Sequence, residues 1–254
     1  MSRMTPHGEF SALAAARDLE RRWGLTLVSF VSGGSAAPLL RLQQHIQKMV
    51  DGHLVLGSDE PLVEFYDVEQ MHCTHLTLTR SSAWGPVGLA DFVKPGIDPQ
   101  QLCDIVARET EGVGTITVRL DRLDFSDNGF QLVGGCADED SVGRRCRLLE
   151  RLNTQLPVCF NLSRRAWDTD PARHEFVHMR LGFMKRPCND DESLAADVAR
   201  LVIDPITLSF ADVALVHHRY RSLRAPHAGS LRFPLNDRAR DRAAPSFGHL
   251  NPRQ

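Results

Sequence analysis

The chain has 254 residues, of which 42% are hydrophobic and 24% charged, and its formal net charge is −2. This composition is typical of a globular protein with a substantial core, and the charge argues against broad non-specific nucleic-acid binding while leaving room for a local basic cleft. The six cysteines form no C-x-x-C pair, no apolar run reaches membrane-spanning length, and no signal core opens the chain, so we expect a cytoplasmic protein with reduced thiols and no membrane partner.

The N-terminal part is predicted to alternate helix and strand. Residues 10–23 have the spacing of an amphipathic helix, and the β-forming run 25–31 follows as a strand. A second helix is expected over residues 36–50, because apolar side chains recur on one side and predict burial against a core. This stripe consists of Leu39, Leu42, Ile46 and Met49 or Val50.

The middle of the chain carries clear boundary signals. Pro99 suits a first helical turn, and a helix is expected to run from Asp98 or Pro99 to about residue 110. Residues 115–120 alternate as a strand, Asp127-Asn128-Gly129 is a hairpin turn, and 130–133 is the return strand. A basic helix follows over 139–156.

The last third is predicted to hold a helix over 191–202 and strands over 206–210 and 213–216. From Arg224 onward, Pro, Gly, Ser and arginine dominate and cannot build a core, so we expect residues 1–223 to form one domain and 224–254 a mostly disordered tail. A basic arm that touches nucleic acid is the alternative interpretation of this tail.

Histidines and threonines are concentrated in residues 71–80. If this segment is a strand, His75 and Thr77 project from one face while Leu76 and Leu78 project from the other. One face would then be buried and the other available for chemistry.

The same segment contains a second His-x-Thr in a different register, His72-Cys73-Thr74. A three-residue shift reverses the face of a strand, so the two pairs exclude each other. We favour His75 with Thr77, because that register buries the leucines, and we expect His72 at the rim.

The order of elements after these histidines recurs later in the chain. His75 is followed by a helix, the strand 116–118 and a return strand, and His178 by a helix, the strand 206–208 and a return strand. We interpret the two units, each a histidine strand, a helix and a hairpin, as a diverged duplication that faces its histidine strands across one cleft.

The two copies read His75-Leu76-Thr77-Leu78 and His178-Met179-Arg180-Leu181. This arrangement, over about residues 24–220, resembles the 2H phosphoesterase superfamily, which contains LigT-like RNA ligases and cyclic nucleotide phosphodiesterases and carries two His-x-Thr/Ser motifs. The resemblance implies an α+β fold with two pseudo-symmetric lobes of antiparallel sheet, helices packed outside and the histidine strands in the cleft. Arg180 departs from the pattern, since a Thr or Ser is expected there.

The resemblance also implies a metal-independent phosphodiesterase without a cofactor, acting on a 2′,3′-cyclic phosphate or on an RNA-end or nucleotide phosphodiester. His75 and His178 would serve as general acid and base, since imidazoles titrate near working pH. Thr77 would bind a phosphate oxygen, and Arg180 would either replace the missing hydroxyl or abolish the chemistry. Arg80 and Lys185 are candidates for substrate binding, with ordinary surface charge as the other interpretation. Hydrolysis and ligation both remain open.

Two other interpretations compete. His174-Glu175-x-x-His178 matches a zinc-hydrolase motif, which requires both histidines on one face of a helix. A non-catalytic module that binds nucleotide or RNA ends through the same cleft is the third possibility.

Overall fold

The structure is a computed structural model that describes residues 23–52, 63–81, 93–126, 129–159, 176–185, 191–219 and 230–236. The strands are β1 Trp23–Phe30, β2 Val63–Phe65, β3 His72–Ser81, β4 Ile116–Ser126, β5 Gly129–Cys136, β6 Val177–Met184, β7 Ile206–Phe210, β8 Asp212–Arg219 and β9 Leu231–Pro234. The α-helices are α2 Ala36–Asp51, α3 Pro99–Thr110, α4 Glu139–Gln155 and α6 Asp191–Arg200. Short 3₁₀ helices span Gly33–Ser35, Val68–Gln70 and Leu156–Val158.

The helices begin and end close to where the sequence predicts. Pro99 is the first residue of α3, and the Asp98 carboxylate accepts a hydrogen bond from the backbone N–H of Gln100 at 2.9 Å. Asp138 caps α4 in the same way, through the N–H of Ser141. The predicted apolar stripe of α2 is buried against the core, with Val50 as its last member.

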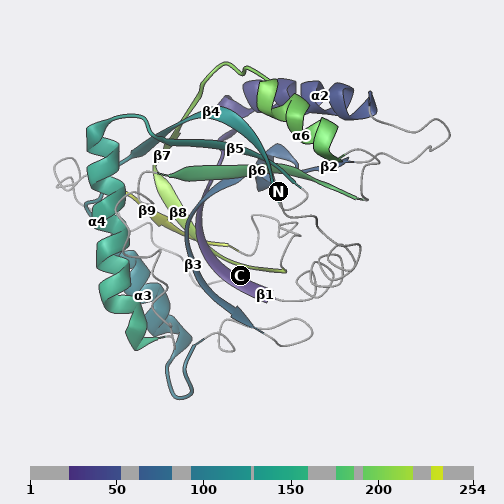
Figure 1. Ribbon diagram of the computed structural model, residues 1–254. Helices are drawn as coiled ribbons and strands as arrows, with labels where there is room; N and C mark the ends of the chain where they lie inside the picture. The colour runs from purple at the N-terminus through teal and green to yellow at the C-terminus, as the bar shows by residue number, and fades with distance from the viewer. Residues whose placement is uncertain are drawn as a thin grey trace, which may run out of the picture.

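All the described strands belong to one curled sheet (Figure 1). Its order is β7-β4-β5-β6-β3-β1-β8-β9, with β2 attached to β6, and all its pairs are antiparallel. The histidine strands β3 and β6 are neighbours at the centre, and three strands continue the sheet on either side of them. The predicted α+β fold with two related halves is confirmed.

The second predicted hairpin is wrong. β4 and β5 pair as expected, but β7 pairs with β4 whereas β8 pairs with β1, so the two strands lie in opposite halves of the sheet. Only Ala211 separates them in sequence. The two halves must therefore approach each other at this residue, which accounts for the curl of the sheet.

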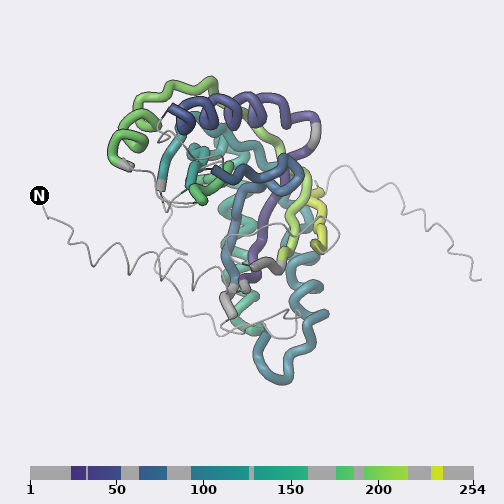
Figure 2. The backbone as a smooth tube through the Cα atoms, turned by 90° about the vertical axis from the view of Figure 1, so that its right-hand side faces the viewer, coloured from purple at the N-terminus to yellow at the C-terminus, as the bar shows by residue number. Residues whose placement is uncertain are grey.

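Within the described ranges, the four α-helices cover the outer face of the curl (Figure 1). α2 and α6 lie together at one end, and α3 packs beside α4 away from them (Figure 2). The main hydrophobic core fills the space between this outer face and the helices. A smaller apolar cluster of Val28, Phe30, Ala214 and Val216 lies on the inner face. Among the described residues, no helix combines the length and apolarity needed to cross a membrane.

Two further boundaries differ from expectation. Trp23 begins strand β1, so the predicted helix 10–23 does not reach it, and residues 10–22 lie outside the described ones. Part of the expected disordered tail is ordered: β9 pairs with β8, and Phe233 is buried. The domain therefore extends at least to residue 236, because a hydrogen-bonded edge strand and a buried aromatic ring stabilise this segment.

Gly134 provides a stability prediction. A Cβ at this position would overlap the carbonyl oxygen of Arg119 and lie 2.8 Å from the Cα of Leu120. Both obstacles are backbone atoms of the paired strand, so Gly134→Ala should lower the free energy of unfolding by about 1–3 kcal/mol. Chemical denaturation measures this value.

Gly143 on α4 is the matched control, because a Cβ there meets only the Arg147 side chain, at 3.6 Å. Gly143→Ala should leave stability unchanged or raise it by up to about 1 kcal/mol, through helix propensity. Equal effects of the two substitutions would contradict the predicted backbone overlap.

Candidate functional site

The site is built on one residue pair at the centre of the sheet. Cys73 of β3 lies directly opposite Met179 of β6, and both side chains are fully buried in the main core. Since side chains alternate along a strand, the residues that flank this pair point to the inner face. His72 and Thr74 flank it on β3, and His178 and Arg180 flank it on β6.

The antiparallel pairing relates these flanking residues by a local two-fold axis. Counting outward from Cys73 and Met179 places Thr74 opposite His178 and His72 opposite Arg180. The two histidines are then diagonal neighbours, which in antiparallel sheets lie about 7–8 Å apart, within reach of long side chains. The axis superimposes His72-Cys73-Thr74 on His178-Met179-Arg180, so these two triplets are the structurally equivalent copies of the motif.

The structure does not place His75 and Thr77 on one face of the sheet, contrary to the sequence prediction. Leu27 of β1 lies opposite Leu76 and Val28 opposite Thr74, so His75 is an extra, bulged residue without a partner on β1. The bulge turns His75 to the core face beside Leu76, and its imidazole contacts the ring of Phe210. His75 and His178 therefore lie on opposite faces of the sheet.

Thr77 does reach the inner face, where it pairs with Thr26 of β1. It lies two β1 residues farther along the strand than Thr74, and it does not share a face with His75. The side chain of Arg80 is outside the described ones, although its backbone pairs with Gly24. Lys185 is exposed just beyond the end of β6, away from the two-fold axis.

His72 is only 6% exposed and is not the rim residue that the sequence suggested. Its Nδ1–H donates to the carbonyl oxygen of Gln70 at 2.7 Å, since a carbonyl only accepts. In the neutral ring this leaves the lone pair on Nε2. Burial lowers the pKa of His72, with the Gln70 hydrogen bond acting in the opposite direction, and Phe30 packs edge-on against the ring.

His178 is half-buried, and its pKa is lowered to about 4. Burial is the largest cause, followed by the positive charge of Arg180 and then by His72 and Arg145. With both pKa values below the usual range, the two imidazoles of the unliganded site are neutral at pH 7. An anion bound between them would supply the negative charge that favours protonation.

Arg180 brings a guanidinium to the inner face. Its side chain extends over Gly129, where any Cβ would overlap it, and its guanidinium carbon lies 5.2 Å from the ring centre of Phe183. Gln131 of β5 is its cross-strand neighbour. Because Gly129 carries no side chain, Arg180 can lie flat along the inner face, with its guanidinium over Gly129 and Phe183.

The zinc interpretation requires a helix at His178. His178 is instead the second residue of strand β6, so His174 and His178 cannot occupy successive turns of one helix. His174 and Glu175 themselves lie outside the described residues. The described residues therefore do not form the helix at His178 that the zinc interpretation requires.

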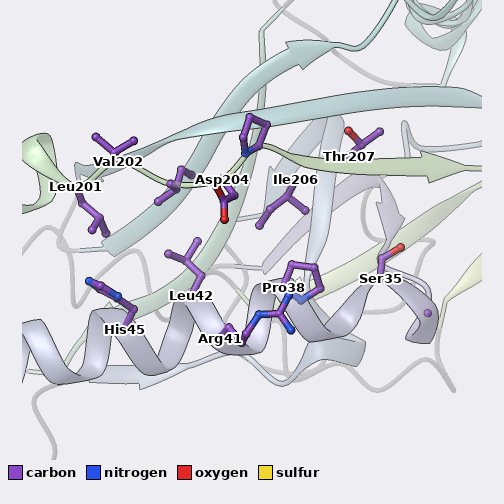
Figure 3. A pocket seen from close by; sticks show the side chains of 13 residues that line it. Ser35, Pro38, Arg41, Leu42, His45, Leu201, Val202, Asp204, Ile206 and Thr207 are labelled. Atoms are coloured by element: carbon purple, nitrogen blue, oxygen red, sulfur yellow. The ribbon is translucent and has the colours of Figure 1, made fainter.

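A separate cavity of about 580 Å³ lies between α2 and the segment that leads into β7 (Figure 3). α2 forms one wall with Arg41 and His45, and residues 201–207 form the other with Asp204. None of the four residues around the two-fold axis lines this cavity.

The sequence does contain a signal for the correct register. Met71 and Cys73 are two residues apart, and so are Leu76 and Leu78, as expected for side chains on one face of a strand. The interval from Cys73 to Leu76 is three residues, so a regular strand could not place both pairs on the same face. All four side chains are buried in the core. Such an interval in an apolar alternation indicates a bulge between the two pairs, and it assigns His72 and Thr74 to the opposite face.

No protein-family model and no curated protein match the chain. Solved structures do. TT0787 of Thermus thermophilus is 12% identical over 84% of this chain and 95% of its own, with a TM-score of 0.44. Usb1 of Kluyveromyces marxianus is 12% identical over 85% and 99%, with a TM-score of 0.46. E. coli LigT complexed with 3′-AMP is 11% identical over 85% and 96%, with a TM-score of 0.41.

All these TM-scores lie below 0.5 and all identities below 25%, so any statement about function rests on the residues of this chain. Another solved structure to which the chain is similar is described as a phosphoesterase; it is 12% identical over 84% of this chain and 95% of its own, with a TM-score of 0.37.

Proposed function

We propose that the protein is a phosphodiesterase that acts on a 2′,3′-cyclic phosphate or on an RNA-end or nucleotide phosphodiester. His72 and His178 would act as general base and general acid on opposite sides of one phosphate. The observation that carries the proposal is the Cys73–Met179 pair, which relates the two histidines by a local two-fold axis on one face of the sheet. In-line displacement at phosphorus requires proton transfer at two opposite positions, and this symmetry suits it.

His72 is the better candidate for the base in hydrolysis. Its Nδ1–H is committed to Gln70, so the neutral ring offers a lone pair at Nε2. Water attacks phosphorus and gives its proton to this nitrogen while one P–O bond to the ribose breaks. His178, protonated when the anionic substrate is bound, gives its proton to the departing ribose oxygen. The reverse sequence of the same steps would form the cyclic ester.

Arg180 and Thr74 would stabilise the phosphate oxygens. In the strand pairing Thr74 lies opposite His178 and Arg180 opposite His72, so a phosphate over the axis has one of these residues on each side. The guanidinium of Arg180 lies over Gly129 and Phe183, and it would have to turn toward the axis to contact such a phosphate. A guanidinium forms charge-assisted hydrogen bonds to phosphate and opposes the charge that develops in the transition state. We therefore assign Arg180 a supporting role in place of the second hydroxyl.

Substitution of each histidine tests the catalytic pair. His72→Ala and His178→Ala should each lower kcat on 2′,3′-cyclic nucleotides by about 10²–10⁴-fold, because each removes one proton transfer. Initial rates are measured in EDTA, and we expect no loss of wild-type activity on chelation.

His45→Ala is the control, because His45 is exposed on α2. It should retain wild-type rates. Activity that depends on added metal, or that survives loss of His72, would rule out the proposed pair. Nucleotide binding without turnover by the wild-type protein would instead favour the non-catalytic binding module.

Arg180 variants decide whether the arginine supports or blocks the reaction. Arg180→Ala should lower kcat/KM by about 10²-fold, as expected for loss of a group that stabilises developing charge. Arg180→Thr, which restores the family's hydroxyl, should recover part of that loss. An increase in kcat/KM on removal of Arg180 would show that it obstructs the site.

The lowered pKa values predict an acid-shifted pH profile. The active form needs one neutral and one protonated imidazole, and burial makes the protonated form scarce at neutral pH. The kcat/KM on a cyclic nucleotide, whose phosphate does not titrate near neutrality, should therefore peak below pH 6.5 and fall as pH rises. A plateau or maximum above pH 7.5 would contradict this expectation.

A further inference from the structure

His75 occupies a buried position that the proposed reaction does not use. It is 5% exposed, it projects from the β3 bulge into the core, and the ring of Phe210 lies 6.4 Å from its own, edge to face. Its nearest polar contact is Ser29 of β1, which is fully buried.

The hydrogen bonds at Ser29 determine the tautomer of His75. The Ser29 hydroxyl donates its single proton to the carbonyl oxygen of Asp212 at 2.6 Å. The 2.9 Å contact between Ser29 Oγ and His75 Nε2 must then have the imidazole as donor. His75 therefore carries a proton on Nε2, and because burial lowers its pKa to about 3 the ring is neutral with Nδ1 unprotonated. The chain His75–Ser29–Asp212 joins the adjacent strands β3, β1 and β8.

This chain lies at the point where the sheet closes. Phe210 ends β7 and Asp212 begins β8, on either side of the residue that connects the two halves. Arg145 of α4 faces the same region, and its charge acts with burial to lower the pKa of His75 to about 3. Protonation of His75 is thus disfavoured, and the buried neutral ring is stabilised by its hydrogen bond to Ser29.

β3 has a competing register without the bulge. With Leu76 and Leu78 kept in the core, a regular alternation would turn His75 to the inner face and would bury His72 and Thr74. The two registers differ in which His-x-Thr faces Arg180. A buried imidazole without a hydrogen-bond partner costs free energy, and Ser29 is the group that supplies a partner in the bulged form.

We propose that Ser29 and His75 are positioning residues that hold the β3 bulge and thereby present His72 and Thr74, rather than His75, at the two-fold axis. The inference rests on the proposed function for its catalytic consequence, but the choice of register is independent of any activity.

The register is tested first without substrate. Imidazole ¹⁵N NMR, assigned with His72→Gln and His75→Gln, should show Nε2–H for His75 and Nδ1–H for His72 in the wild-type protein. In Ser29→Ala, His75 should titrate at least one pH unit higher and His72 should lose the Nδ1–H tautomer. Unchanged tautomers and titrations in Ser29→Ala would overturn the proposal, whether or not the protein is an enzyme.

Kinetics on a 2′,3′-cyclic nucleotide form the second arm. Ser29→Ala and His75→Phe should lower kcat by about 10–100-fold, the loss expected from misplaced reacting groups, with KM within about threefold. His75→Gln keeps a donor near the position of Nε2 and should recover kcat to within about threefold of wild type. Equal rates for His75→Phe and the wild type would also overturn the proposal.

Ser209→Ala is the matched control, since it removes a strand hydroxyl that hydrogen-bonds Thr117 Oγ1 at 3.0 Å on the surface. It should leave the NMR spectra and rates unchanged. If Ser29→Ala does not fold by circular dichroism, the comparison of His75→Gln with His75→Phe decides the question. A wild-type protein that shows the expected tautomers but no turnover would refute the proposed function and leave the positioning role standing.

Discussion

The antiparallel contact between β3 and β6 is the constraint on which the candidate site depends. One pair, Cys73 with Met179, is buried where the two halves of the sheet join, and everything on the inner face follows from it. If the two strands slipped by a single residue, the cysteine and methionine would leave the core and the histidines would enter it. The cost of exposing those apolar side chains therefore holds the motifs in register.

The β3 bulge reconciles two requirements that a regular strand cannot meet together. The leucines at 76 and 78 must remain in the core, and so must Cys73, yet their spacing in sequence is odd. One extra residue absorbs the difference, and that residue is a histidine. Burying a polar ring in this position requires a partner, which β1 supplies through Ser29. The chemistry of the inner face and the packing of the outer face are coupled through this residue.

His75 and His178 have different roles because their surroundings in the fold differ. His75, with a pKa of about 3, is enclosed by the core and faces Arg145, whereas His178, with a pKa of about 4, is half-buried beside Arg180. An anion can approach only the second, and a phosphate there would counter both the burial and the arginine charge. The same imidazole group thus has a structural role on one face and a candidate catalytic role on the other.

The sequence alone determined most of the elements and the kind of site. Helix caps such as Asp98, the apolar stripe of α2 and the duplicated order of elements identified the α+β fold, because these signals are local and each residue acts through its near neighbours. His178 and Arg180 were also identified, since β6 alternates regularly on either side of Met179. Only the tertiary structure decided which His-x-Thr of β3 joins them. That choice depends on cross-strand partners distant in sequence, Ser29 and Asp212 among them, and on how the sheet closes beside Phe210.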